Sequence, residues 1–598
     1  MGKNILNNLN SDQIKAVKAT EGPNLILAGA GSGKTRVLTY KAAYLVDINQ
    51  ILPENILMVT FTNKAAGEML ERLKSFFQNS NISTLPLAAT FHSFCARILR
   101  REGKYIGLSP NFIIYDDLDT KEAVRQAMDK LGINRKNFSP GAIASTIAQA
   151  KNELIPHLEY AQIARGYFQE TAAYIYPVYQ NILLENKAVD FEDLIYLTVK
   201  LFSDFHEVLN KYQNIFRYIL IDEYQDTNYA QYMLSKLLAK RDRNITVVGD
   251  ASQSIYNFRG ADYRNILKFK EDYSDVKIFH LEKNYRSTQI ILDAAHTIIA
   301  KNQSHPILKL WTEKKGGEKI TVYEAANEHD EANFIIENLV NYNIAEVAIL
   351  YRTNAQSRII EEALLHAGIP YILVGGIRFY ERKEIKDVIC YLRLIVNPKD
   401  SISLKRAQKI GKKRFEKLME FRDKIIVGDT QLSTLQIMDG IIETTKYVEL
   451  YNKENPEDLM KIENIKELRS VAAEFSDLNQ FLENVSLIER EYTPDHPAEY
   501  IDDGKVTLMT MHAAKGLEFK VVFMVGIEEG LFPHSMSLVD PLELEEERRL
   551  CYVGYTRARE KLILSYARRR LYFGQRTANT VSRFISELPE ELVDSNYL

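Results

Sequence analysis

The hydrophobic positions of this chain fall into short β-branched runs separated by longer stretches of helical period. Apolar residues at consecutive positions predict strands that are buried on both faces, and alternation of such runs with helices predicts parallel α/β layers. The runs that we interpret as buried strands are 24–29, 56–62, 218–223, 245–250, 346–352 and 521–526. The sequence therefore predicts an α/β fold.

The alternation stops in two places, and helical patterns take over there. This organisation predicts two α/β cores, each interrupted by a mostly helical insertion. The expected division is a first core at 1–100 and 190–275 with the insertion 101–189, and a second core at 276–396 and 504–598 with the insertion 397–503.

Composition and charge narrow the class of protein. A chain of 598 residues is too long for one hydrophobic core. The net charge of −4 provides no overall positive field, so nucleic-acid binding would have to use a local groove. Cys95, Cys390 and Cys551 are far apart, which argues against a disulfide framework or a zinc site and favours a reducing cytoplasm. The absence of a membrane-length apolar run or a signal peptide predicts no membrane partner.

A glycine-rich turn lies between the run 24–29 and a helical pattern. The strict phosphate-loop motif begins with glycine where this chain has Ala28, but the glycines that follow still permit a backbone nest for phosphate oxygens. Lys34 would reach the β- and γ-phosphates, and Thr35 would ligate Mg²⁺. The alternative is a flexible turn with a surface lysine. The expected nucleotide-binding residues are Ala28, Gly29, Ala30, Gly31, Ser32, Gly33, Lys34, Thr35 and Arg36.

Two adjacent carboxylates close the run 218–223. Neighbours on a strand point to opposite faces, which indicates separate roles for Asp222 and Glu223. Asp222 suits the outer shell of a metal ion, and Glu223 suits orienting and deprotonating an attacking water. In isolation the pair could be an exposed acidic strand end. Beside Lys34 it predicts a nucleotide triphosphatase that uses Mg²⁺.

Six further segments occur in a fixed order: TFTNKAAGEMLERL (60–73), TFHSFCARIL (90–99), VVGDASQSIYNFRGAD (247–262), LEKNYRS (281–287), VTLMTMHAAKGLEFKVVFMVG (506–526) and EEERRLCYVGYTRARE (545–560). With LNSDQ near the start, they resemble the superfamily 1A DNA helicases of the UvrD, PcrA and Rep type over nearly the whole chain. The resemblance implies two RecA-like P-loop NTPase domains. It also implies ATP-dependent 3′–5′ movement along single-stranded DNA, with unwinding in repair or replication.

The resemblance assigns roles around ATP. Gln13 resembles the residue that reads the adenine edge, Tyr285 its stacking partner, and Glu518 a ribose contact. Gln253 resembles the sensor that links the γ-phosphate to DNA.

Arg286 and Arg557 resemble the two arginines that the second motor domain presents to the γ-phosphate. A guanidinium group offers a fixed fork of donors for charge that develops on the transferred phosphoryl group. A surface ion pair is the alternative for Arg286. Gln225 and Asp226 are expected to couple the ATP site to the rest of the motor.

The single-strand channel is expected to combine aromatic faces with backbone contacts. The aromatic residues in matching motifs are Phe61, His92, Tyr256 and Phe258. Simple core packing is the alternative for them, and the family commonly has tryptophan in place of Phe258. The other expected DNA contacts are Thr62, Asn63, Thr90, Arg259, Thr510 and His512.

The chain departs from the family pattern in its second insertion. The stretch 397–503 is shorter than the duplex-contacting subdomain of the family, and the segment 403–418 is either a remnant of its helix–glycine–helix contact at Gly411 or a solvated lysine-rich helix. The preceding segment, 375–398, matches the family where a role in domain architecture is expected. Since the chain ends soon after YTRARE, we expect neither a long partner-binding tail nor a nuclease domain.

The expected partners are single-stranded DNA, junctions of single and double strands, and DNA repair or replication proteins. We expect a cytoplasmic, nucleoid-associated protein that acts as a monomer or a DNA-induced dimer. Three alternatives stay open: a translocase that displaces proteins but unwinds weakly, a non-motor ATP-switched DNA-binding protein, and a motor that uses RNA as its track.

Overall fold

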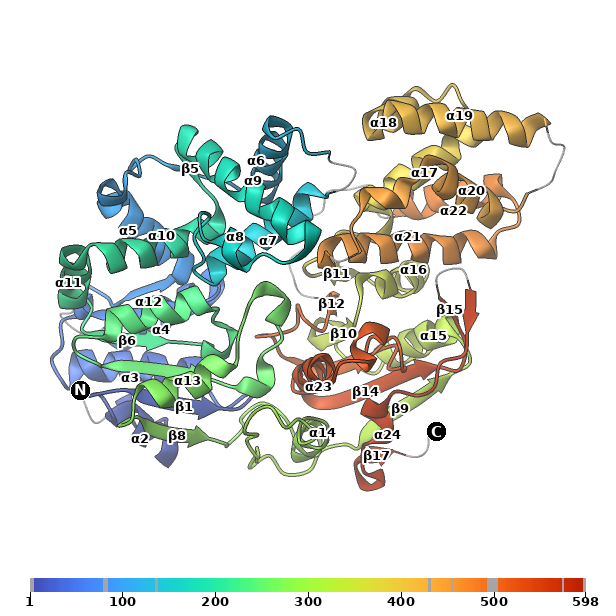
Figure 1. Ribbon diagram of the computed structural model, residues 1–598. Coiled ribbons are helices and arrows are strands. Elements are labelled where there is room, and N and C mark those ends of the chain that lie inside the picture. The colour runs from blue at the N-terminus through green and yellow to red at the C-terminus, as the bar shows by residue number, and fades with distance from the viewer. Residues whose placement is uncertain are drawn as a thin grey trace. The chain divides into compact units, whose positions relative to one another are not determined.

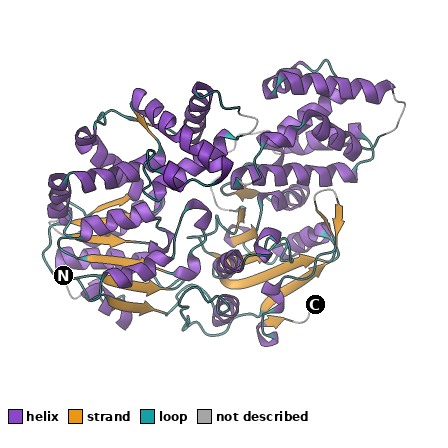
Figure 2. Cartoon of the chain, viewed as in Figure 1, coloured by secondary structure: helices purple, strands orange, loops and turns teal. Residues whose placement is uncertain are grey.

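The chain forms two compact units, Met1–Tyr285 with Gln303–Glu313, and Arg286–Asn302 with Lys314–Leu598. The computed structural model describes residues 5–78, 84–134, 138–427, 432–453, 455–491, 504–572 and 575–594. Each unit contains a parallel sheet and a group of helices (Figure 1, Figure 2). The predicted α/β class, with two parallel-sheet cores and helical insertions, is confirmed.

The first unit is built on a six-stranded sheet of order β3-β2-β6-β7-β1-β8 in which all neighbours are parallel. Alternate side chains of the strands enter opposite cores: Leu25 and Leu27 join one cluster, and Ile26 and Ala28 join the other. Because both faces are buried, β1, β2, β6 and β7 consist mostly of consecutive apolar residues, whereas the edge strand β8 is largely exposed. The strands are β1 (Asn24–Ala28), β2 (Ile56–Thr60), β3 (Leu87–Thr90), β6 (Tyr218–Ile221), β7 (Ile245–Gly249) and β8 (Lys277–Leu281).

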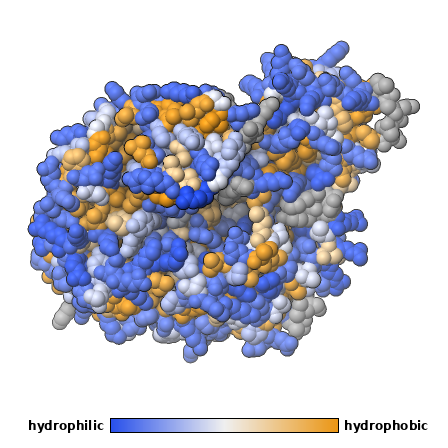
Figure 3. All heavy atoms as spheres, viewed as in Figure 1, coloured by the Kyte–Doolittle hydropathy of each residue, from blue (hydrophilic) through white to orange (hydrophobic). Residues whose placement is uncertain are grey.

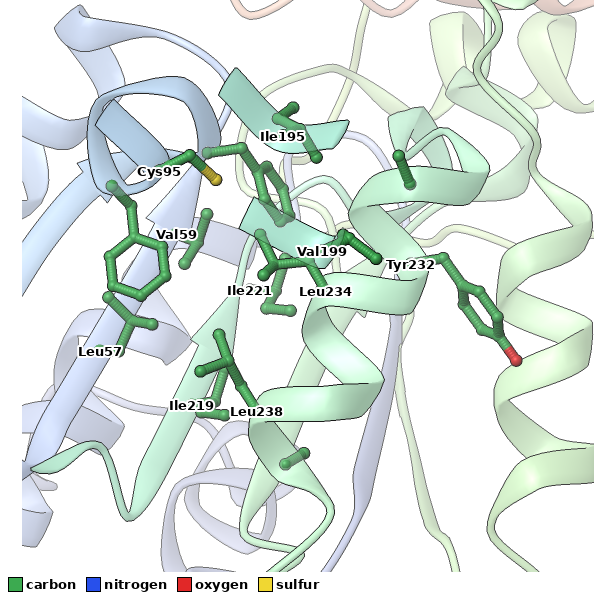
Figure 4. Close-up of a cluster of buried hydrophobic side chains, with 14 of the residues drawn as sticks. Leu57, Val59, Cys95, Ile195, Val199, Ile219, Ile221, Tyr232, Leu234 and Leu238 are labelled. Atoms are coloured by element: carbon green, nitrogen blue, oxygen red, sulfur yellow. The ribbon is translucent and has the colours of Figure 1, made fainter. Parts of the chain in front are cut away.

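Helices cover both faces of this sheet. One face is covered by α2 (Ser11–Lys18), α3 (Lys34–Asp47) and α4 (Asn63–Phe77). The other is covered by α5 (Phe91–Glu102), α10 (Phe191–Asp204), α11 (His206–Ile215), α12 (Tyr229–Ala239) and α13 (Arg264–Asp272). Figure 4 shows the second core, where Val59 and Ile221 of the sheet lie near Val199 of α10 and Leu234 of α12.

The first insertion has a core of its own, built from α6 (Asp117–Lys130), α7 (Pro140–Asn152), α8 (Tyr160–Ile163) and α9 (Gly166–Glu185). Two short parallel strands, β4 (Ile113–Ile114) and β5 (Ala188–Val189), pair where the chain enters and leaves the insertion. At the exit, Lys151 Nζ lies 2.5 Å from Asp190 and 2.8 Å from Asp193, so buried ion pairs attach α7 to the first turn of α10.

The second unit is built on a seven-stranded parallel sheet of order β11-β12-β10-β13-β14-β9-β17. Its strands are β9 (Ile320–Ala325), β10 (Val347–Tyr351), β11 (Tyr371–Leu373), β12 (Val506–Thr510), β13 (Phe519–Met524), β14 (Ala558–Ala567) and β17 (Val593–Asp594). Its helices outside the insertion are α14 (Gln289–Ile299), α15 (Glu328–Leu339), α16 (Ser357–His366), α23 (Pro541–Tyr555) and α24 (Arg583–Ser586). A short antiparallel pair, β15 (Arg570–Tyr572) and β16 (Gln575–Thr577), follows β14.

The second insertion is also helical. Its helices are α18 (Ser401–Ile410), α19 (Lys412–Val427), α20 (Thr434–Thr445), α21 (Pro456–Glu474) and α22 (Leu478–Glu491). They share one hydrophobic core with α17 (Lys383–Val396), which contributes Ile385, Val388 and Leu392. The helix α17 therefore packs with the insertion that follows it.

The face of the molecule in Figure 3 is mostly hydrophilic, with apolar side chains in scattered patches. Across the described ranges, none of the helices combines the length and apolar character that a membrane crossing requires.

Candidate nucleotide and nucleic-acid site

The glycine-rich turn connects β1 to α3. A hydrogen bond within the turn and packing against Leu310 hold its conformation. Gly31 and Gly33 have φ values of 66° and 88°, a left-handed conformation that glycine adopts without strain. The Ser32 hydroxyl donates to the Gly29 carbonyl oxygen over 2.8 Å, which closes the turn. A Cβ atom on Gly29 would lie 2.3 Å from a Leu310 methyl carbon, so glycine is required there by packing.

The start of α3 presents unmatched positive charge. No side chain caps the helix at Gly33, so the N–H groups of its first turn are open to an anion. The Lys34 Nζ atom is buried and makes no hydrogen bond to the described residues. It forms an ionic contact with Glu223 Oε2, 3.3 Å away. A buried ammonium group and a helix N-terminus that meet in one place fit the phosphates of a nucleotide.

Thr35 and Asp222 form the second part of the site. The Thr35 hydroxyl donates to Asp222 Oδ2 over 2.6 Å. Burial, and then the charge of Glu223, raise the pKa of Asp222 to about 7, against the opposing effects of Thr35 and Lys34. A divalent cation would favour the ionised form of such a carboxylate. The hydroxyl and carboxylate oxygens are the ligand types that Mg²⁺ prefers, so this pair fits the ion.

Glu223 follows Asp222 at the carboxyl end of β6. Its backbone is left-handed, with φ of 51°, a conformation that costs free energy for a residue other than glycine. Its carboxylate contacts Lys34 and also accepts a hydrogen bond from Gln225 Nε2 over 2.6 Å. Gln253 lies one loop away, where its Nε2 donates to Asp250 Oδ2 over 2.6 Å. The structure thus brings Lys34, Thr35, Asp222 and Glu223 together.

Gln13 lies against the glycine-rich turn. Its Nε2 donates to the Ser32 carbonyl oxygen over 2.9 Å, and its Oε1 accepts from the Asn10 N–H over 3.1 Å. The second bond is half of a capping box that fixes the start of α2. The Arg36 guanidinium bonds the segment before α2, since its Nη2 donates to the Asn8 carbonyl oxygen over 2.7 Å.

Tyr285 lies on the same side of the turn as Gln13. The Tyr285 N–H donates to the Gly31 carbonyl oxygen over 3.0 Å, and its hydroxyl accepts from Asn10 Nδ2 over 2.8 Å. Its ring remains 43% exposed, which leaves a face for stacking. Asn284 Nδ2 donates to the Ala30 carbonyl oxygen over 2.7 Å, so the segment before Arg286 is attached directly to the phosphate turn.

The expected DNA contacts of the first unit also follow carboxyl ends of strands. Thr62 follows β2 and caps α4, accepting from the Ala65 N–H over 3.1 Å. Thr90 ends β3 and caps α5 in the same way through Ser93. Asn63 opens α4 and is exposed. The sheet therefore carries its nucleotide residues and its expected DNA residues at the same end of its strands.

The aromatic residues of this group differ in exposure. Phe258 is 53% exposed, and its ring centre lies 6.2 Å from that of the half-buried Tyr256. Phe61 is half-buried against Phe91, with ring centres 5.6 Å apart. The side chain of Arg259 lies outside the described part of the structure.

The His92 ring packs, tilted by 33°, against a residue that no motif identified. Its ring centre lies 4.2 Å from that of Phe191, the first residue of α10, and Phe191 is 50% exposed. Burial lowers the pKa of His92 to about 4, so the imidazole is neutral at physiological pH.

In the second unit, Arg286 and Glu518 form an ion pair. Arg286 Nε donates to Glu518 Oε2 over 2.6 Å, and its Nη1 donates to the Thr556 carbonyl oxygen over 3.2 Å. Burial opposes ionisation of Glu518, but the guanidinium of Arg286 lowers its pKa overall. The Glu518 side chain is 45% exposed, whereas that of Arg286 is 14% exposed, so the carboxylate is the more accessible partner of the pair.

Arg557 is held inside the second unit. The residue is 1% exposed, and its guanidinium donates to the carbonyl oxygens of Val553 and Leu517 and to the Thr556 hydroxyl, over 2.9, 3.1 and 3.1 Å. In this conformation its donors are used by its own unit. Thr510 ends β12 and accepts from the Ala513 N–H over 3.3 Å, and the half-buried His512 lies in the turn that follows.

Sequence reasoning missed four residues that hold this site: Asn10, Asn284, Phe191 and Leu310. Asn10 and Asn284 lie inside motifs that were identified, directly beside Ser11 and Tyr285, so their polar side chains were the available signal. Leu310 and Phe191 carry no such signal, because their roles depend on packing between distant segments.

The two parallel sheets, with a phosphate turn and a pair of carboxylates at the carboxyl ends of strands in the first, define a RecA-like P-loop NTPase. The family model described as the UvrD/REP helicase N-terminal domain matches residues 9–274. The model described as the UvrD-like helicase C-terminal domain matches residues 279–451 and 436–569. The chain belongs to the UvrD/REP helicase family, which confirms the resemblance.

Individual relatives match along the whole length. The ATP-dependent DNA helicase PcrA of Bacillus subtilis is 43% identical over 645 residues, covering 99% of this chain and 87% of the relative. The protein of the same name from Staphylococcus aureus is 42% identical, covering 99% of this chain and 88% of the relative. That of Leuconostoc citreum is 41% identical, covering 99% and 86%.

Proposed function

We propose that this protein is an ATP-dependent DNA helicase that moves 3′ to 5′ along single-stranded DNA and unwinds duplexes in DNA repair or replication. The main support is the cluster of Lys34, Thr35, Asp222 and Glu223 at one end of a parallel sheet that also carries the expected DNA residues. The names of the related proteins agree with this activity.

ATP hydrolysis is assigned to residues of the first unit. Lys34 and the N-terminus of α3 bind the phosphates, since both are positive, the Lys34 ammonium makes no hydrogen bond to the described residues and no side chain among them caps the helix. Glu223 accepts a proton from the attacking water while the bond from the γ-phosphorus to its bridging oxygen breaks. Gln13 and Tyr285 receive the adenine ring.

Thr35 and Asp222 would hold Mg²⁺, which when bound neutralises charge on the phosphate oxygens. The Thr35 hydroxyl and the Asp222 carboxylate already lie within hydrogen-bond distance of each other. Gln253, Arg286, Arg557 and Glu518 are proposed to complete the site when the nucleotide is bound, with the arginines opposite charge on the γ-phosphate.

For Arg557 this role requires a change of partners, because its donors are engaged by Val553, Leu517 and Thr556. Arg286 needs a smaller change, since it would exchange its ion pair with Glu518 for a phosphate oxygen.

DNA binding is assigned to the loops after β2, β3 and β7 of the first unit and to the end of β12 with the turn that follows it in the second. The exposed ring of Phe258 offers a stacking face that tolerates any base. The neutral imidazole of His92 suits a flat contact more than a phosphate contact. The other proposed contacts are Phe61, Thr62, Asn63, Thr90, Tyr256, Arg259, Thr510 and His512.

We propose the domain division expected above: motor domains at 1–100 with 190–275 and at 276–396 with 504–598, and insertions at 101–189 and 397–503. The protein is proposed to act in the cytoplasm on the nucleoid, as a monomer or a DNA-induced dimer, at junctions of single- and double-stranded DNA. Its protein partners would be repair or replication factors.

A Glu223→Gln variant tests the hydrolytic site. We expect it to bind ATP and single-stranded DNA with ordinary affinity but to lose DNA-stimulated ATP turnover by about 100-fold or more, as is typical of a lost general base. Steady-state ATPase rates and fluorescence binding measure both quantities. Substantial residual turnover would exclude Glu223 as the base.

Polarity is tested with two substrates that differ only in the tail. We expect unwinding of a duplex with a 3′ single-stranded tail and little unwinding of the same duplex with a 5′ tail, because loading precedes movement toward the duplex. A strand-displacement assay in the presence of ATP and Mg²⁺ measures this. Preference for the 5′ tail would overturn the proposed direction.

A second candidate function is a translocase that displaces proteins and unwinds weakly. The alignment with the Bacillus subtilis relative has 645 positions, whereas this chain has 598 residues, so at least 47 aligned positions have no counterpart here. A shortened second insertion would weaken duplex contact. Single-strand translocation at a normal rate without strand separation would favour this function.

A further inference from the structure

Gln225 lies between the carboxylate that is assigned as the base and the segment that carries the DNA-side aromatics. The residue is fully buried in the short helix that follows Glu223 (Tyr224–Asp226). Its amide makes two short hydrogen bonds in opposite directions, besides a longer one of 3.4 Å from Nε2 to Asp226 Oδ2. Nε2 donates to Glu223 Oε2 over 2.6 Å, and Oε1 accepts from the Asp250 N–H over 2.9 Å.

The far side of this amide is attached to the loop after β7. Asp250 is the first residue after that strand, and its carboxylate accepts from Gln253 Nε2 over 2.6 Å and from the Ser252 N–H over 3.0 Å. The Ser254 hydroxyl donates to the Gln225 carbonyl oxygen over 3.3 Å. The loop therefore holds Gln225 through both its side chain and its backbone.

The packing around Gln225 leaves no other orientation for the amide. Gly249 ends β7, and a Cβ atom on it would lie 2.9 Å from Gln225 Oε1 and 3.0 Å from an Ile266 methyl carbon. The absence of a side chain at Gly249 thus makes room for the amide. A swapped amide would also set its NH₂ group against the Asp250 N–H, which is a donor.

We infer that Gln225 is a positioning residue that transmits the state of the DNA-side loop to Glu223. The path runs from the Tyr256–Phe258 segment through Gln253 and Asp250 to the Gln225 amide, and from there to the Glu223 carboxylate. A displacement of the Asp250 N–H moves Gln225 Oε1, and the planar amide passes that displacement to Gln225 Nε2, which donates to the Glu223 carboxylate. Lys34 also contacts the Glu223 carboxylate but is required by the phosphates, whereas the Gln225 amide can keep its contact with Glu223 during hydrolysis.

The inference rests on the proposed role of Glu223, and the predicted effect is on the hydrolysis step. A small misplacement of a base reduces the rate of chemistry with little effect on substrate binding. Loss of the Gln225 amide should therefore lower the DNA-stimulated kcat and leave the KM for ATP nearly unchanged.

Two substitutions distinguish the hydrogen bond from Gln225 to Glu223 from the one that Gln225 accepts from Asp250. Gln225→Met keeps the approximate volume and removes both hydrogen bonds. Gln225→Glu can still accept the Asp250 N–H but, when ionised, no longer donates to Glu223. We expect both variants to lose about 10- to 100-fold in DNA-stimulated kcat, with KM for ATP changed less than about threefold. Only Gln225→Met should also weaken single-stranded DNA binding, since only it releases the loop.

Gln231→Met is the matched control. Gln231 is a buried glutamine of the same unit, 4% exposed, and its Oε1 accepts from the Asn228 N–H over 3.0 Å in a capping box. Its loss should cost similar stability and leave kcat within about threefold. Thermal unfolding of all variants shows whether they are equally folded.

The outcomes distinguish the inference from the proposed function. If Glu223→Gln abolishes turnover while Gln225→Met behaves like Gln231→Met, the inference is wrong and the function stands. If Gln225→Glu retains full DNA stimulation, the hydrogen bond to Glu223 does not carry the effect. If Glu223→Gln retains turnover, the assignment of the base itself fails.

Discussion

At the scale of single residues, the site contains several features that lower stability. Glu223 has a left-handed backbone, Asp222 is a buried carboxylate beside another one, and Lys34 is a buried ammonium without a hydrogen-bond acceptor among the described residues. Each costs free energy in the ligand-free protein, and phosphates with a divalent cation would offset the last two. Such costs are expected where binding, and not folding, has selected the residue.

The packing of Gly29 against Leu310 gives a prediction for the phosphate turn. A methyl group at Gly29 would lie 2.3 Å from a Leu310 methyl carbon, and Leu310 is 6% exposed, so the side chain has little room to move. We expect Gly29→Ala to destabilise the unit by about 1–3 kcal/mol, the usual range for overpacking. It should also reduce ATP binding.

A second substitution tests the cause of that defect. Gly29→Ala combined with Leu310→Ala should recover ATP affinity that the single Gly29→Ala variant loses, because the colliding methyl groups are gone. Leu310→Ala alone controls for the cavity. Isothermal titration with a non-hydrolysable ATP analogue measures the affinities, and an unchanged affinity in Gly29→Ala would contradict the steric argument.

Lys41 gives a prediction of pH dependence away from the catalytic groups. It lies on α3, fully buried, and its Nζ donates to the carbonyl oxygens of Ala16 and Ala19 at the end of α2, over 3.1 and 2.5 Å. Burial, and then the charge of Lys277, lower its pKa to about 7, against the opposing charge of Glu21.

Between this value and its unfolded pKa near 10.5, the unfolded chain binds the proton more tightly than the folded one. Stability therefore rises with pH through that window, by up to about 1.4 kcal/mol per pH unit from this group. The difference in free energy of unfolding between the wild type and Lys41→Met should change in favour of the wild type from pH 7 to 10. Urea unfolding at both pH values measures it, and a constant difference would contradict the lowered pKa.

At the scale of elements, the helix α21 joins the second insertion to the sheet core of its unit through polar contacts. Glu467 Oε1 accepts from Arg358 Nε over 2.8 Å, and Asn464 Oδ1 accepts from Arg382 Nη1 over 2.8 Å. On the same helix, one turn before Glu467, Glu463 lies 3.4 Å from His534. A helix whose inner face carries glutamates at helical spacing is attached by charge complementarity more than by apolar packing.

This interface predicts a large difference between buried and exposed ion pairs. Arg358 and Glu467 are 1% and 8% exposed, so Arg358→Met would leave a buried carboxylate without its partner, at about 3–5 kcal/mol. The control is Asp439→Asn, which breaks a half-exposed pair with Arg469 on the same helix and should cost less than about 1 kcal/mol. Chemical unfolding compares the two, and equal costs would contradict the electrostatic attachment.

The contacts of α21 also show what the sequence could not predict. Buried strands such as β1, β2, β6 and β7 were predicted because both of their faces are apolar. The strand β8 was missed because it forms an edge and exposes Lys277 and Ile278. From the sequence alone, the glutamates on the inner face of α21 would be assigned to solvent, because the arginines that pair with them come from other elements.

The residues of the candidate site likewise differ in how well the sequence predicted them. Motif residues such as Lys34 and Glu223 were identified because their chemistry is local. Gln225 was only a weak candidate, because its importance depends on the position of Asp250, which the fold brings from the next strand of the sheet. The expected phosphate contacts can therefore be predicted from one segment of the sequence, whereas the hydrogen bonds that support them, which join distant segments, cannot.

At the scale of the whole molecule, the second insertion is not a separable appendage of its unit. The apolar face of α17 is covered by the insertion, where Ile385 and Val388 belong to the same buried cluster as Met438, Leu468 and Phe481. The residues proposed to bind ATP and DNA, by contrast, lie mostly on loops that follow strands of the two sheets. Removing the insertion should thus affect folding through α17 before it affects chemistry.

A deletion of 397–503 with a short linker should therefore be poorly soluble, because it exposes the face of α17. The same deletion with Ile385, Val388, Ile389 and Leu392 changed to polar residues should be monodisperse in size-exclusion chromatography. We expect this second protein to keep DNA-stimulated ATPase within about threefold of the full chain. Its unwinding of long duplexes should fall, since the exposed lysines of α18 and α19 are lost. Unwinding at the full rate would show that the insertion is dispensable for strand separation, and good solubility of the unmodified deletion would show that α17 is stable without its cover.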